Sequence, residues 1–191
     1  MRQQIRNEIA AIKALDALEQ EQLIDALSWI DSDAELFRIA KPATPAKHLV
    51  SYFAVVDDGH ILLVDHKNAQ LWLPAGGHVE IDEHPRDTVL RELQEELGFT
   101  PSHEIDAPLM LTCATTVGHT AGHTDVSLWY VVHASRKQEL QFDTSEFNAI
   151  RWFRFSEVPL QRSDPHMSRF LNKLSSQQAS LCSSTLRNSV Q

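Results

Sequence analysis

Residues 77–99 read GHVEIDEHPRDTVLRELQEELGF and carry the most informative pattern in this 191-residue chain. Pro85 suits the first position of a helix, and Gly98 suits the left-handed residue that ends one, so the segment predicts a helix over 85–97. Apolar residues at helical spacing predict the buried face of that helix; they are Val89, Leu90, Leu93 and Leu97.

Three glutamates share another face of this predicted helix. Glu92, Glu95 and Glu96 stand at i, i+3 and i+4, where each like-charged pair destabilises an isolated helix by about 0.2–0.5 kcal/mol. A solvated glutamate-rich face is one interpretation. A divalent cation between the carboxylates is the other, and oxygen ligands favour Mg²⁺, with Mn²⁺ as a substitute. Gly76 and Gly77 support the second, because a glycine backbone can approach a ligand closely.

The surrounding sequence predicts a mixed α/β domain over 46–174. A helical extension over 1–45 precedes it, ended by Pro42 and Pro45. Asp16 and Glu19 resemble a capping box at the start of the second helix of that extension. Runs rich in β-formers predict strands at 49–56, 61–64, 109–117, 126–132 and 150–155.

The C-terminal part of the chain predicts one more helix and a tail. The helix is expected over 164–174, with Asp164 as its cap and Pro165 at its first position. Residues 175–191 are rich in Ser and Gln, and we expect them to be disordered.

The spacing of the glycine, charged and apolar residues in 77–99 resembles the box of the Nudix (MutT-type) hydrolases, G-x5-E-x7-R-E-U-x-E-E-x-G-U, where U is a bulky apolar residue. The match has no gap or substitution, at Gly77, Glu83, Arg91, Glu92, Leu93, Glu95, Glu96, Gly98 and Phe99. The resemblance implies the α/β (α+β) fold of that family, a mixed β-sheet sandwiched between helices, with the box as a loop–helix–loop.

The resemblance also implies roles for individual residues. Glu92, Glu95 and Glu96 would be metal ligands and catalytic residues, and the carbonyl of Gly76 a further ligand. The resemblance implies structural roles for four other box residues: Glu83, Arg91, Gly77 and Gly98. Glu83 and Arg91 would form a salt bridge.

The implied activity is hydrolysis of a phosphoanhydride bond in a nucleoside diphosphate derivative or a nucleoside triphosphate, with Mg²⁺ offsetting the phosphate charge. Glu92 is the first candidate for the base that accepts a proton from the attacking water. Glu146, six residues before Trp152, is a candidate fourth catalytic carboxylate, because loops on a rigid scaffold commonly supply site residues. An exposed loop glutamate is the alternative.

A second polar cluster occurs in GHTAGHTD, residues 118–125. His119, His123 and Asp125 have the spacing of metal ligands, but the two glycines favour a turn, and no fourth ligand is near in the sequence. A transition-metal site is therefore not favoured. Contact with the substrate through His123 or Asp125 is the alternative to a plain turn. His78 is interpreted as a surface or cap residue, with contact to the substrate as its alternative.

Composition limits the partners. The chain has 17 basic and 26 acidic residues and a net charge of −9, which argues against nucleic-acid binding because phosphate neutralisation needs clustered Lys and Arg. No apolar run approaches a membrane span. Two cysteines and the absence of a signal-peptide core fit the cytoplasm. We expect a small nucleotide-like substrate, and the N-terminal helices are candidates for a homodimer element, a lid or an intramolecular brace.

Two other functions compete with hydrolysis. The first is a Nudix-fold nucleotide-binding regulator without catalysis, which would not need three mutually repelling carboxylates. The second is a Nudix-fold isomerase of a prenyl diphosphate, which would need a catalytic cysteine outside the box, and Cys113 is the candidate.

Overall fold

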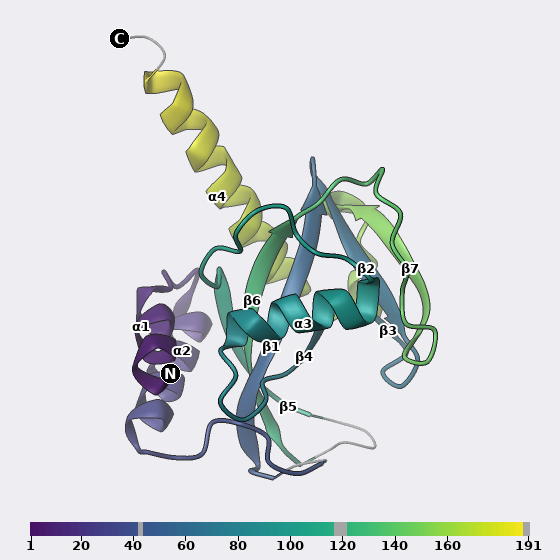
Figure 1. Cartoon of the computed structure of the whole chain (residues 1–191). Helices are drawn as coiled ribbons and strands as arrows, with labels where there is room; N and C mark the ends of the chain where they lie inside the picture. The colour runs from purple at the N-terminus through teal and green to yellow at the C-terminus, as the bar shows by residue number, and fades with distance from the viewer. Residues whose placement is uncertain (42–43, 117–121, 189–191) are drawn as a thin grey trace.

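The computed structural model describes residues 1–41, 44–116 and 122–188 (Figure 1), with side chains described as far as residue 179. Its elements follow in the order α1 (Arg2–Ala11), α2 (Ala17–Asp31), β1 (Lys47–Asp57), β2 (His60–His66), β3 (Leu71–Leu73), β4 (Ala75–His78), α3 (Pro85–Leu97), β5 (Met110–Thr115), β6 (Thr124–His133), β7 (Phe147–Arg154), the 3-10 turns η2 (Phe155–Glu157) and η3 (Leu160–Arg162), and α4 (Met167–Asn188).

Strand β1 is the centre of a seven-stranded mixed sheet. The strand order is β3-β2-β1-β6-β5, with β4 paired to β1 and β7 paired to β2. β1 runs parallel to β6 and antiparallel to β2 and β4. Its N-terminal part lies between β4 and β6, from Val50 opposite His78 to Phe53 opposite Ala75 on the β4 side. This register brings the end of β4 and the start of β6 to one place.

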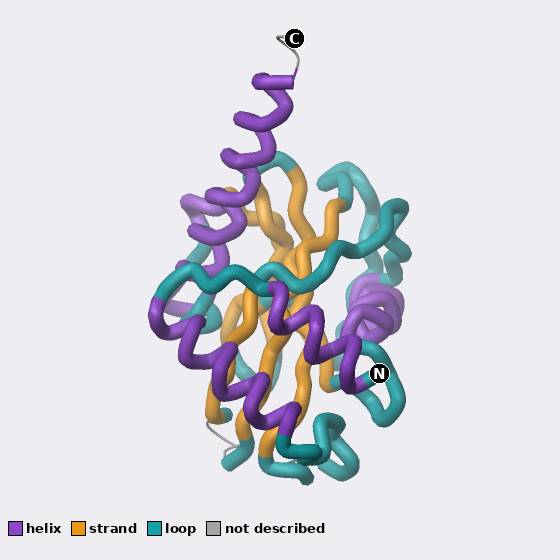
Figure 2. The backbone as a smooth tube through the Cα atoms, turned by 90° about the vertical axis from the view of Figure 1, so that its left-hand side faces the viewer, coloured by secondary structure: helices purple, strands orange, loops and turns teal. Residues whose placement is uncertain are grey.

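Helices cover both faces of the sheet, because successive side chains of a strand point to opposite faces. Phe53 and Val55 of β1 join one apolar core with residues of α1, α2 and α3. Ala54 and Val56 join a second core with residues of α4. Figure 2 shows the strands standing between α3 and α4, with α1 and α2 toward the viewer. The predicted mixed sheet between helices is confirmed.

The N-terminal helices pack on the domain. Ile5, Ile9 and Ile30 are fully or almost fully buried in the core that α3 shares. The Asp16 side chain accepts the Glu19 N–H over 2.9 Å and caps α2, as the capping pattern predicts. The same two residues also reach α4: Glu19 forms a buried ion pair with Lys173, and Asp16 an ion pair with Arg169. Among the three expected roles, these contacts fit an intramolecular brace.

The C-terminal helix differs from its prediction. α4 begins at Met167, after a turn in which the Asp164 carboxylate accepts the His166 N–H over 2.7 Å, and continues to Asn188. Residues 175–188 are therefore helical where the sequence predicts a disordered tail, and 189–191 lie outside the described residues. The physical reason is that Phe170 and Leu174 anchor the helix on the sheet, and extending an existing helix adds one hydrogen bond for each residue fixed.

The segment before α3 also differs. Residues 71–73 and 75–78 form the short strands β3 and β4, which are not among the predicted strands. β3 pairs with β2, and β4 pairs with β1. These partners supply the backbone hydrogen bonds that make both segments strands. Across the described residues, no helix has the combination of length and apolar character that a membrane crossing requires.

Candidate active site

Helix α3 carries the glutamates and is fixed at both ends. Pro85 stands in its first turn, where the His84 side chain accepts the Arg86 N–H over 3.2 Å. Gly98 ends it in the left-handed conformation, with φ of 59°, as predicted. Val89, Leu93 and Leu97 are buried against the sheet. Leu90 is 42% exposed, so its predicted place on the buried face is wrong: it lies one residue beyond the stripe that the sheet covers.

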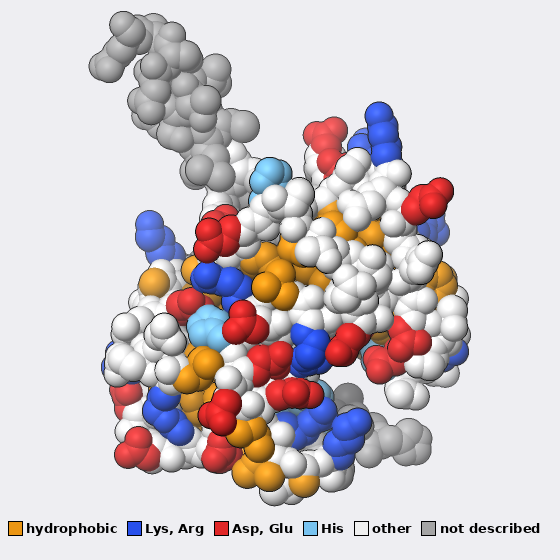
Figure 3. Space-filling model, in the orientation of Figure 1, with side chains coloured by type: hydrophobic (Ala, Val, Ile, Leu, Met, Phe, Trp, Pro, Cys, Tyr) orange, Lys and Arg blue, Asp and Glu red, His pale blue; other side chains and the backbone are white. Residues whose placement is uncertain are grey.

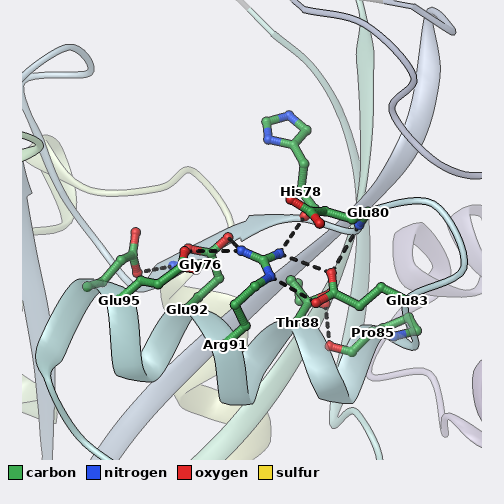
Figure 4. A network of polar contacts seen from close by, with 11 residues as sticks. Gly76, His78, Glu80, Glu83, Pro85, Thr88, Arg91, Glu92 and Glu95 are labelled. Carbon is green, nitrogen blue, oxygen red and sulfur yellow. Dashed lines mark hydrogen bonds and ion pairs between the residues drawn. The ribbon is translucent and has the colours of Figure 1, made fainter.

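Arg91 is the centre of a polar network on this helix (Figure 4). Its Nε and Nη2 donate to the Glu83 carboxylate over 2.9 and 3.0 Å, the paired geometry that a guanidinium and a carboxylate favour. The Thr88 hydroxyl donates to the same carboxylate over 2.7 Å. Nη1 donates to Glu92 over 2.7 Å and to Glu95 over 3.3 Å. Arg91 thus relieves part of the repulsion among the glutamates, which the sequence did not indicate.

The three glutamates have unequal surroundings. Glu96 is only 5% exposed, and its Oε2 accepts the Gly76 N–H over 3.1 Å, whereas 60% of the Glu95 side chain is exposed. Burial raises the pKa of Glu96 to about 9, and the charges of Glu92 and Glu146 add to this shift. Burial also raises the pKa of Glu92. In the space-filling view, acidic side chains lie in a band across the region of α3, with basic side chains among them (Figure 3).

Gly76 and Gly77 bring strand β4 directly against α3. A Cβ on Gly77 would lie 1.8 Å from Glu92 Oε1, and a Cβ on Gly76 would lie 2.3 Å from the Ser51 carbonyl oxygen. A side chain at position 76 would clash with the backbone of β1, and one at position 77 would displace the Glu92 carboxylate. The backbone of Gly77 thus closely approaches the Glu92 carboxylate, whereas the sequence predicts a close approach to a ligand.

The structure brings the loop before β7 toward the same glutamates. Glu146 is exposed, and its charge contributes to the raised pKa of both Glu92 and Glu96. The loop is anchored to the end of α3, since the Asp143 N–H donates to the Glu96 carbonyl over 2.9 Å. The charge of Asp143 also acts on Glu96, and no pattern in the sequence marked that residue.

These residues fit a hard divalent cation. Glu92, Glu96 and Glu146 offer only carboxylate oxygens, which Mg²⁺ prefers. The pKa of Glu96 is raised by burial and by neighbouring carboxylates, and the hydrogen bond from Gly76 acts against this shift. The pKa of Glu92 is raised by burial although Arg91 contacts its carboxylate. Glu95 lies at the margin of this group, where Arg91 contacts it.

A cavity adjoins the glutamates. It has a volume of about 140 Å³ and its lining includes Tyr52, Gly76, Gly77, Glu96, His78 and Asp125. Pockets for drug-sized ligands are about 300–1,000 Å³, so this cavity is smaller than a typical ligand pocket. His78 and Asp125, for which substrate contact is one of the alternatives, lie at this cavity.

His123 and Asp125, of the polar segment 118–125, lie in a tighter cluster than their spacing in the sequence predicts. His123 is 4% exposed and lies beside Asp125, and His48, which the sequence did not single out, is fully buried next to both. His119 lies outside the described residues. Burial, together with the nearby charge of Arg38, lowers the pKa of His78 to about 3.

Comparisons with known proteins agree with this geometry. A family model described as NUDIX domain matches residues 47–174. The chain is 33% identical over 93 residues to the "Probable DHNTP pyrophosphohydrolase" of Lactococcus lactis subsp. cremoris, covering 48% of this chain and 54% of that protein. It is 29% identical over 133 residues to the "MutT-like protein" of Streptomyces ambofaciens, covering 69% of this chain and 80% of that protein. The chain thus spans about half the length of the first of these relatives.

The fold has counterparts among solved structures. The crystal structure of the MutT NUDIX hydrolase from Burkholderia pseudomallei is 26% identical, with a TM-score of 0.57, and the likeness covers 66% of this chain and 97% of that one. The helices outside the matched domain are α1, α2 and the end of α4.

Proposed function

The chain belongs to the Nudix family, and we propose that it is a pyrophosphohydrolase that cleaves a phosphoanhydride bond in a nucleoside diphosphate derivative or a nucleoside triphosphate. Water attacks one phosphorus, the bridging P–O bond breaks in line, and both products leave as phosphates. Bound Mg²⁺ would supply positive charge to the phosphate oxygens and lower the pKa of the attacking water.

One observation carries this proposal. The buried Glu96 lines a cavity together with Gly76 and Gly77, and the Glu92 carboxylate lies against Gly77. A buried carboxylate is stabilised when a cation binds beside it, and we infer that a phosphate group of the substrate enters the cavity at that point. We infer that Glu92 and Glu96 hold the cation, with Glu95 and the Gly76 carbonyl as further ligands.

The remaining residues position these carboxylates and move the proton. Glu83 fixes Arg91 with two hydrogen bonds, and Arg91 in turn orients Glu92. Orientation of this kind holds reacting groups in register and can contribute much of a rate enhancement. Glu92 is our first candidate for the base that accepts the water proton. Glu146 is the second, because it is exposed and its charge reaches the same site.

The alternative functions gain no support. Cys113, which an isomerase reading needs, lies on β5 with its Sγ 4.0 Å from the Gln22 carbonyl oxygen of α2. Burial raises the pKa of Cys113 to about 11, so the thiolate is disfavoured at neutral pH. An inactive regulator would gain nothing from a buried glutamate whose ionisation is unfavourable.

Product analysis tests the proposal and identifies the substrate class. The chain is incubated with Mg²⁺ and a panel of nucleoside triphosphates, oxidised nucleoside triphosphates, ADP-ribose, dinucleoside polyphosphates and nucleotide sugars. Release of phosphate, pyrophosphate or nucleoside monophosphate reports which bond is cleaved. The pyrophosphohydrolase name of the Lactococcus relative favours pyrophosphate. An intact panel after incubation at high enzyme concentration would contradict the proposal.

A further inference from the structure

Strand register collects four metal-ligating side chains on one face of the sheet. His48 of β1 lies opposite Asp125 of β6, and Val50, two residues along β1, lies opposite His78 of β4. Alternate residues of a strand share a face, so His48, His78 and Asp125 point to the same side. His123 precedes Asp125 by two residues and joins them.

The four side chains converge on a small volume. One ligand atom from each lies within 4.8 Å of the others. The Nε2 atoms of His48 and His123 each lie 3.3 Å from Asp125 Oδ1, and His78 Nε2 lies 4.0 Å from it. In a tetrahedral zinc site with metal–ligand distances of about 2.0–2.1 Å, neighbouring ligand atoms stand about 3.3–3.4 Å apart. Two of these three separations match that spacing, and the third is within a small side-chain shift of it.

Hydrogen bonds on the outer ring nitrogens orient the inner ones. His48 Nδ1 lies 2.8 Å from the Pro45 carbonyl oxygen, which can only accept, so this nitrogen carries the proton. His123 Nδ1 lies 3.0 Å from Thr116 Oγ1, and that hydroxyl donates to the His123 carbonyl over 3.2 Å, so His123 Nδ1 also donates. Both rings therefore present an Nε2 lone pair to the cluster. Metal-bound histidines are usually held in this way.

The inner atoms lack partners of their own. Among the described side chains, His48 Nε2, His78 Nε2 and Asp125 Oδ1 are buried and have no hydrogen-bond partner. Acceptors buried against one another are unfavourable unless a cation lies between them. His48, fully buried, is aimed into the cluster from the core.

From this arrangement we propose that His48, His78, His123 and Asp125 bind one transition-metal dication of the Zn²⁺ type. Three imidazoles and one carboxylate suit such a metal, whereas the all-oxygen site on α3 suits Mg²⁺. Four protein ligands make the site closed, which is typical of structural metals. The ion would join β1, β4 and β6 at the wall of the cavity, and so hold the strand that carries Gly76 and Gly77. This site does not depend on the proposed hydrolysis.

Metal binding by the untagged, metal-stripped full chain tests the proposal. Equilibrium dialysis with Zn²⁺ should give one tightly held ion per chain, and Co²⁺ should give the intense visible absorption of a tetrahedral complex. His78→Gln and Asp125→Asn should each weaken Zn²⁺ binding at least about tenfold. His133→Gln, an exposed histidine on the same strand as Asp125, should bind like the parent chain. Glu96→Gln should also retain the zinc site.

Two results would overturn the proposal. One is a parent chain that takes up no Zn²⁺ and shows no tetrahedral Co²⁺ spectrum. The other is undiminished Zn²⁺ binding by folded His78→Gln and Asp125→Asn chains. Because His78 is partly exposed, its replacement by Gln leaves the core in place. The Co²⁺ spectrum of the parent chain decides even where a variant does not fold.

Discussion

The carboxylate of Glu92 occupies the space that a side chain on Gly77 would need: a Cβ there would lie 1.8 Å from Glu92 Oε1. The second glycine of β4 and the first glutamate of α3 are thus two parts of one contact. In this chain, the presence of a glycine at position 77 beside Glu92 is therefore a steric requirement as well as a chemical one.

Replacement of Gly77 by Ala should therefore displace Glu92 and lower kcat by about tenfold or more, since small misplacements of positioned groups are costly to catalysis. Mg²⁺ affinity, measured by calorimetry, should fall with it. Gly59→Ala is the matched control: its φ of 71° is strained for Ala, but no atom lies within 4 Å of the new Cβ. That control should lose stability and keep kcat. Equal kcat and equal Mg²⁺ affinity in Gly77→Ala and the parent chain would contradict the claim that Gly77 fixes the position of Glu92.

Glu146 should matter to turnover although it is exposed. Its charge reaches Glu92 and Glu96, and removal of a general base slows a reaction by about 10²–10⁴-fold. We expect Glu146→Gln to lower kcat, with a KM and a circular dichroism spectrum close to those of the parent chain. Glu139→Gln, another exposed loop glutamate, is the control and should have no effect. If the two variants turn over equally, Glu146 is an ordinary surface residue.

The pH dependence of stability should report the burial of Glu96. Its pKa is raised from 4.5 to about 9 in the folded chain, so the native state binds more protons than the unfolded state between these values. The free energy of unfolding of the metal-free chain should then fall as pH rises from about 4.5 to about 9. Urea denaturation at several pH values measures this, and Glu96→Gln should flatten the profile. A profile that is the same in both chains would contradict the assigned shift.

The pair formed by Glu19 and Lys173 should brace the N-terminal helices. Glu19 is fully buried, Lys173 is 8% exposed, and the Glu19 carboxylate also accepts the Leu15 and Leu111 N–H groups. Lys173→Met leaves a buried charge unpaired and should lower the free energy of unfolding by about 3–5 kcal/mol. Lys137→Met, in an exposed loop, should change it little. Equal destabilisation by the two would show that the pair does not hold α2 to α4.

The local sequence pattern was enough to predict α3 and its glutamates, because the signals for helix ends and helical periodicity lie in consecutive residues. The same pattern missed β4, since Gly76 and Gly77 are poor strand formers and only pairing with β1 makes them a strand. The prediction that Leu90 is buried is wrong because an apolar side chain does not by itself indicate which part of the helix surface packs against the sheet.

The histidine cluster shows a different limit. His123 and Asp125 are close in sequence, but His48 and His78 come from other strands and reach them only through the register of β1 with β4 and β6. No single segment of the sequence contains all four of the proposed ligands. Long-range register, which a single sequence does not fix, supplies the other two.

The most direct measurement of the central claim is Mg²⁺-dependent product release by the parent chain and by Glu96→Gln, on whichever compound of the panel the parent chain cleaves. Loss of this buried carboxylate should abolish turnover and weaken Mg²⁺ binding while the thermal unfolding transition remains cooperative, and EDTA should stop the parent reaction. Full activity of Glu96→Gln, or an unchanged parent rate in EDTA, would contradict the assignment of this site to metal-dependent phosphoanhydride hydrolysis.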